Sequence, residues 1–151
     1  MMKLLYLSLF IILINTPENC TCSYNIASDF NTFETVFKAR IIETSSSFKK
    51  GFNKTAKLEI LKVYKGKPDN KIASKLGGCS TPILSKNKSW IFFTNKENNI
   101  QVLGSCNPSI KLYPSKLKAK NPKSLKHWKE RLDRNLNILD SLSKNKKILS
   151  N

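Results

Sequence analysis

Four cysteines constrain the fold of this chain more than any other feature. Cys20, Cys22, Cys79 and Cys106 all follow an apolar N-terminal segment, and an even number of cysteines in an exported chain indicates two disulfides. Cys20 and Cys22 are separated by one residue, so we expect each to bond to one of the two distant cysteines, which leaves two pairings open. A zinc site of four thiolates is the alternative, but such sites usually draw their ligands from two close Cys-x-x-Cys pairs, which this chain lacks.

The N-terminal segment has the features of a secretory signal. Lys3 precedes an uncharged apolar run at residues 4–14, and a polar break follows at residues 15–18. The run is too short for a membrane-spanning helix, which needs about 20 apolar residues, and it has no polar face for an amphipathic helix. We therefore expect residues 1–19 to be a signal peptide and the protein to be secreted without a transmembrane anchor. The residues before Cys20 fit a cleavage site poorly, which leaves the mature N-terminus open.

Five short runs rich in β-branched and aromatic residues follow the first cysteines, and turn residues separate them. A short helix is expected ahead of them, at residues 26–33. The dipeptide Asn98-Asn99 predicts a hairpin between the last two runs. Five such strands predict a small closed or nearly closed barrel. The expected strands are residues 36–42, 58–64, 72–76, 90–94 and 100–103.

The last part of the chain is strongly basic and has a helical pattern. The whole chain has 27 Lys+Arg and 10 Asp+Glu, a net charge of +17 that predicts attraction to polyanions. Asn121 and Pro122 are suited to the cap and first position of a helix. Apolar residues then recur every three or four positions over residues 125–142, which predicts a helix of about 20 residues with one face on the barrel and fraying from Lys144. The basic residues expected to face solvent are Lys126, Lys129, Arg131 and Arg134.

Several short segments occur in a definite order along the chain: Cys20-Thr21-Cys22, Val36-Phe37-Lys38-Ala39-Arg40-Ile41, Lys62-Val63-Tyr64-Lys65-Gly66, Cys79, Trp90-Ile91-Phe92-Phe93 and Gly104-Ser105-Cys106. Together they resemble the tissue inhibitors of metalloproteinases (TIMPs) and the wider netrin-like (NTR) module. The resemblance covers about residues 20–110, in the order of the family and at similar spacing. It implies a mainly β fold, a five-stranded OB-fold barrel of TIMP/NTR type, with two disulfides, Cys20–Cys79 and Cys22–Cys106. A basic segment at residues 111–151, which contains the C-terminal α-helix, flanks it.

The resemblance also implies a mechanism of inhibition. In TIMPs the α-amino nitrogen and the carbonyl oxygen of the N-terminal cysteine chelate the zinc of the target protease, and the next side chain enters its specificity pocket. Here Cys20 is the implied chelator and Thr21 the implied pocket residue, with a zinc metalloprotease as partner and no cofactor or metal of the protein's own. Chelation requires Cys20 to be the first residue of the mature chain. An α-amino pKa near about 8 leaves a neutral fraction of the amine for the zinc.

A second hypothesis is a binding module without inhibitory activity, because netrin-like modules also occur in proteins that inhibit no protease. Its basic C-terminal helix would bind sulfated glycans or other acidic glycans, an anionic envelope or a protein partner. We expect no enzyme, since the single histidine, His127, falls on the surface of the expected helix and no nucleophile, base or metal cluster surrounds it. Trp90, Phe92 and Phe93 are a possible stacking surface for nucleic acid, but core packing and export favour no nucleic-acid partner.

Overall fold

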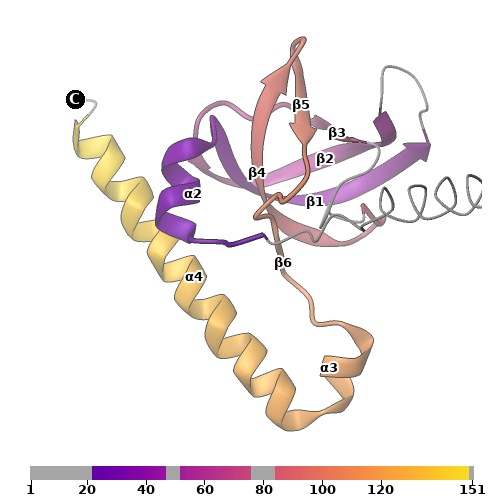
Figure 1. Ribbon diagram of the computed structural model, residues 1–151, viewed down its shortest axis with the longest axis vertical. Helices are drawn as coiled ribbons and strands as arrows, with labels where there is room; N and C mark the ends of the chain where they lie inside the picture. The colour runs from indigo at the N-terminus through magenta and orange to yellow at the C-terminus, as the bar shows by residue number, and fades with distance from the viewer. Residues whose placement is uncertain (1–21, 47–51, 76–83, 150–151) are drawn as a thin grey trace, which may run out of the picture.

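Five strands close into a barrel, as the sequence predicted. The computed structural model describes residues 22–46, 52–75 and 84–149. The strands are β1 (Thr35–Ser46), β2 (Phe52–Lys65), β3 (Lys71–Lys75), β4 (Ser89–Glu97) and β5 (Ile100–Leu103). They pair in the order β1-β2-β3-β5-β4, and β4 pairs back onto β1 to close the barrel (Figure 1). The β3–β5 pair is parallel and the other pairs are antiparallel, so the barrel is mixed.

Side chains on the two faces of β4 explain why this strand is apolar throughout. Neighbouring side chains of a strand point to opposite faces, so Trp90 and Phe92 belong to the barrel interior while Ile91 and Phe93 belong to an outer cluster. All four are buried because helices cover the outer face. The prediction that these aromatic residues form the core is confirmed, and they present no exposed stacking surface.

Two helices cover the outer face of the barrel (Figure 1). They are α2 (Ile26–Thr32) and α4 (Pro122–Leu149). The sequence predicted α2 within one residue of its observed end. Buried apolar side chains from both helices meet those of the strands in the outer cluster, which consists of Phe30, Val36, Tyr64, Ile91, Phe93 and Leu139.

The long C-terminal helix begins where the sequence predicted. The side-chain oxygen of Asn121 accepts a hydrogen bond of 3.2 Å from the backbone N–H of Ser124, and Pro122 is the first helical residue. The helix then runs for 28 residues to Leu149. The predicted length of about 20 residues was therefore wrong, because apolar spacing marks where a helix packs and not how far it extends. The expected fraying from Lys144 stays a prediction.

Only the C-terminal part of the apolar stripe packs on the barrel. Leu139 is buried in the outer cluster, and Leu136 and Leu142 pack against it. The N-terminal half of α4 continues beyond the barrel (Figure 1), and its Trp128 and Leu132 are half-buried along a cavity. The expectation that the whole stripe lies on the barrel was wrong, because the helix is longer than the barrel face that it crosses.

The structure adds two short elements that the sequence did not predict. β6 (Ile110–Lys111) pairs with β4 at the edge of the sheet, and α3 (Lys116–Lys120) connects it to α4. The hydroxyl of Ser115 caps α3 by accepting a hydrogen bond of 3.3 Å from the N–H of Lys118. Elements of two and five residues are too short to show a periodic pattern.

Two turns fix the register of the strands. Asn98 and Asn99 have φ values of 50° and 62°, which confirms the predicted hairpin between β4 and β5. Gly66 directly follows β2 and has φ 72°, and a Cβ atom there would lie 2.5 Å from the backbone oxygen of Glu34. Only glycine is accommodated at this position without a shift of the backbone.

In the part of the chain that the structure describes, no helix is both long and apolar enough to cross a membrane. The segment expected to be a signal peptide lies outside the described residues.

Candidate functional site

A disulfide holds the N-terminal segment on the barrel. Cys22 is bonded to Cys106, with 5.3 Å between their Cα atoms and 84 positions between them in sequence. This is one of the two bonds that the family resemblance implied. Cys22 is half-buried and Cys106 is exposed, so the bond lies at the surface. An oxidising compartment is where such bonds persist, which favours an extracytoplasmic location.

The turn that carries Cys106 is fixed by its buried neighbour. Asn107 donates a hydrogen bond of 2.7 Å from its amide to the backbone oxygen of Phe93, and its side-chain oxygen accepts one of 3.0 Å from the N–H of Ser109. Asn107 is buried, so these bonds compete little with water. The disulfide therefore anchors the N-terminal segment to a rigid part of β4.

On the other side of the disulfide, the segment enters α2 through a reciprocal cap. The side chain of Asn25 accepts hydrogen bonds from the N–H groups of Ala27 and Ser28, and the carboxylate of Asp29 accepts one from the N–H of Asn25. Burial raises the pKa of Asp29, and the hydrogen bond from Asn25 partly offsets that rise. The segment around Cys22 is thus fixed at both ends.

Neither residue predicted to touch the target is within the described part of the chain. Cys20 and Thr21 lie outside it, and so does Cys79, so the Cys20–Cys79 bond and both inhibitory roles stay predictions. The structure therefore describes the support of the predicted inhibitory segment, at Cys22, and not the segment itself.

The four basic residues predicted to face solvent are all exposed on α4. Among the described residues the ion pairs are Arg40–Glu59, Lys62–Asp140, Lys75–Glu97 and Lys96–Asp69, and none includes these four. The Lys62–Asp140 pair, at 2.5 Å, joins β2 to α4, and its hydrogen bond raises the pKa of Lys62. Within the described residues, Lys126, Lys129, Arg131 and Arg134 thus have no carboxylate partner.

A cavity of about 740 Å³ lies between the β6 edge and the N-terminal half of α4; we call it the barrel–helix groove. Its aromatic lining residues are Tyr24, Trp90, Tyr113 and Trp128, and its charged ones are Lys111, Lys118 and Arg131. No aspartate or glutamate is among its described lining residues. Burial raises the pKa of the Tyr113 phenol, which stays neutral at physiological pH. The groove combines aromatic surface with uncompensated positive charge.

The sequence did not predict this groove. Its residues come from five separate segments, between Tyr24 and Asn135, and no local pattern relates them. Trp128 and Leu132 were assigned to the helix face that packs on the barrel, and the cations of the groove were part of a general basic segment. The spacing of apolar residues in the sequence predicts one helix or strand at a time, whereas the groove depends on how far apart several elements lie in space.

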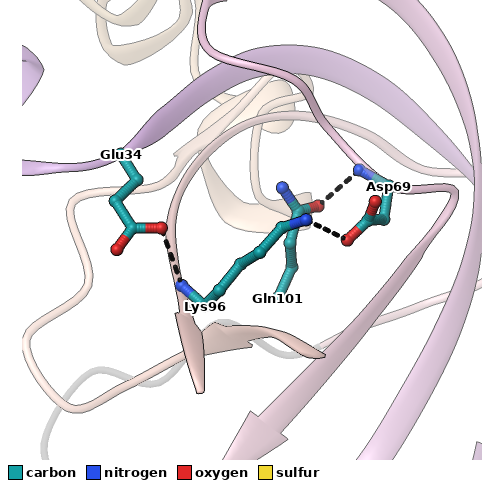
Figure 2. Close-up of polar contacts among 4 residues, drawn as sticks. All are labelled: Glu34, Asp69, Lys96 and Gln101. Carbon is teal, nitrogen blue, oxygen red and sulfur yellow. Dashed lines mark hydrogen bonds and ion pairs between the residues drawn. The ribbon is translucent and has the colours of Figure 1, made fainter. Parts of the chain in front are cut away.

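A polar network around the β4–β5 hairpin has a structural role (Figure 2). Lys96 joins two parts of the barrel: its ammonium lies 3.1 Å from the carboxylate of Asp69, and its backbone N–H donates to the carboxylate of Glu34 at 3.2 Å. The amide oxygen of Gln101 accepts a hydrogen bond of 3.0 Å from the N–H of Asp69. These contacts tie the β4–β5 hairpin to the β2–β3 turn and to the start of β1.

The described residues contain no group of three or more His, Cys, Asp and Glu side chains placed to hold a metal ion. His127 is exposed on α4, where the sequence placed it. The candidate sites among the described residues are the chain from Cys22 to Asn25, the exposed cations of α4 and the barrel–helix groove.

No family model matches the chain, and no curated protein matches it significantly.

Proposed function

We propose that this protein is a secreted TIMP-like inhibitor of zinc metalloproteases. The observation that carries the proposal is the Cys22–Cys106 bond, which fixes the chain directly after Cys20 and Thr21 to a rigid surface of the barrel. A binding segment that is held in place loses little conformational entropy when it meets its partner. The closed order of five strands also supports assigning the barrel to the OB-fold of the TIMP and netrin-like family.

In this proposal the zinc belongs to the target and the ligands to this chain. The neutral α-amine and the carbonyl oxygen of Cys20 form a five-membered chelate and displace the water that zinc would activate. The side chain of Thr21 enters the specificity pocket next to the zinc. The chelate requires a free amine, because an amide nitrogen has no lone pair available for the metal.

Intact-mass measurement of the exported protein tests the first requirement. We expect a mature chain that begins at Cys20; a chain that begins at any earlier residue would overturn chelation. The second test uses cleavage of a fluorogenic peptide by a panel of zinc metalloproteases. One alanine added before Cys20 should abolish inhibition, whereas one alanine added after Asn151 should leave it unchanged.

The second candidate function is binding of an acidic glycan or other polyanion by α4. The observation that favours it is the row of exposed cations on this helix, none of which pairs with a carboxylate in the described residues. Retention on immobilised heparin should fall steeply with salt, because surface charges are screened within about 8 Å at physiological ionic strength. Glutamine at all four positions should reduce retention; they are Lys126, Lys129, Arg131 and Arg134.

A matched control separates this surface from net charge. Three exposed lysines of the barrel, Lys57, Lys67 and Lys71, have no ion-pair partner in the described residues and can be replaced by glutamine in the same way. If the barrel variant loses as much retention per charge as the helix variant, heparin responds to total charge and α4 has no special role.

A further inference from the structure

We propose that the barrel–helix groove binds an acidic peptide segment of a partner protein, with a large apolar residue of that segment as anchor. This inference rests on the second candidate function, in that it names the partner class, and it does not depend on chelation by Cys20. The groove is lined by the N-terminal half of α4, by β6 and by the chain on either side of β6.

The apolar wall of the groove is an uncovered continuation of the helix face that packs on the barrel. Leu139 completes the outer cluster, whereas Trp128 and Leu132, on the same stripe, are half-buried along the groove. Ile110 of β6 and Tyr24 line the groove as well, and Tyr24 is 46% exposed. Such a surface gains free energy when an apolar side chain removes it from water.

The charges of the groove select the ligand. Lys111, Lys118 and Arg131 are exposed in its lining, and no acidic residue accompanies them among the described lining residues. A guanidinium binds a carboxylate through two parallel hydrogen bonds, so Arg131 is suited to aspartate or glutamate. Tryptophan, tyrosine and arginine together are the residues that contribute most to protein–protein binding. The partner is therefore acidic and carries an apolar anchor.

One backbone feature favours a peptide over a glycan. β6 is the edge strand of the described sheet, pairing there only with β4, and Ile110 and Lys111 both line the groove. An extended peptide can pair with such an edge, which a glycan cannot do.

Selection of a random twelve-residue peptide library on the full mature chain provides the probe. We expect the selected peptides to be enriched in Asp and Glu and to contain a large apolar residue. Isothermal titration of a selected peptide then compares two exposed arginines of α4. Arg131→Glu, in the groove, should weaken binding about tenfold or more, whereas Arg134→Glu, outside it, should change affinity by less than about threefold. Trp128→Ala should also weaken binding about tenfold, with far-UV circular dichroism verifying the helix.

Three results would overturn the inference. The first is a selection without acidic enrichment, and the second is equal weakening by Arg131→Glu and Arg134→Glu, which would assign binding to charge along the helix. The third is a heparin oligosaccharide whose affinity depends on Trp128 while no selected peptide depends on it, which would assign the groove to a glycan. Loss of heparin retention through Arg134 alone would concern the second candidate function and leave the groove unaffected.

Discussion

Replacing Leu139 by alanine tests how α4 is held on the barrel. Leu139 has no exposed surface and contacts an outer cluster of buried aromatic and aliphatic side chains. Alanine there removes buried carbon atoms and leaves a cavity in a packed cluster, which costs about 3–5 kcal/mol of the free energy of unfolding. For a chain of this size each kcal/mol lowers the melting temperature by about 2–4 °C, so we expect a decrease of about 6–20 °C.

The matched control is Leu132→Ala on the same stripe of the same helix. Both substitutions create alanine, the best helix former, so their effects on helix propensity are equal. Leu132 is half-buried along the groove and is absent from the outer cluster, so its replacement should cost less than about 1 kcal/mol. Urea unfolding followed by far-UV circular dichroism measures both. A cost for Leu139→Ala within about 0.5 kcal/mol of that for Leu132→Ala would refute the uneven packing of α4.

Three further predictions concern single features of the barrel. Alanine at both Cys22 and Cys106 should lower the free energy of unfolding by about 4–5 kcal/mol, since the bond spans 84 positions. A decrease below about 1 kcal/mol in urea unfolding would contradict a stabilising role of this disulfide. Gly66→Ala should lower the free energy of unfolding by about 1–3 kcal/mol, because the residue has φ 72° and the new Cβ meets the backbone oxygen of Glu34. An unchanged melting temperature would argue against this conformation of the turn. Burial raises the pKa of the Tyr64 phenol above its usual 10.0, so its contribution to the free energy of unfolding is present below pH 10 and is lost as the pH rises above it. Between pH 8 and pH 11 the free energy of unfolding should therefore decrease less in Tyr64→Phe than in the original protein. An equal decrease in both proteins would contradict burial of the phenol.

The sequence predicted the individual elements of the barrel well, because each depends on local chemistry. Asn98-Asn99 favours the positive φ values of a hairpin, and Asn121-Pro122 favours a helix start, whatever surrounds them. The apolar and aromatic residues at 90–93 predicted a strand, and the structure shows that this strand is buried on both faces. The short β6 and α3 were missed, since a pattern needs several repeats before it can be recognised.

The candidate site was predictable only in part, for a related reason. Arg131 and Arg134 are exposed because both lie outside the apolar stripe, and the sequence predicted this exposure. That Arg131 lines the groove and Arg134 does not depends on the path of α4 past β6. Helical periodicity predicts the direction in which a side chain points from the helix axis. It does not predict which other element that side chain faces.

The sequence by itself thus predicted five β-strands, a hairpin at two asparagines, a capped basic helix and a distant partner for Cys22. It underestimated the length of β1 and β2, which have 12 and 14 residues. Tertiary structure decided which strands form the seam of the barrel, β1 and β4, and which of the two distant cysteines bonds to Cys22, a choice that cysteine spacing left open. It also decided that α4 covers the barrel with only its C-terminal half. The physical reason is the separation in sequence of the residues that make contact. Turns, caps and periodic faces arise from contacts within a few residues, whereas the barrel seam and the barrel–helix groove depend on contacts between residues distant in sequence.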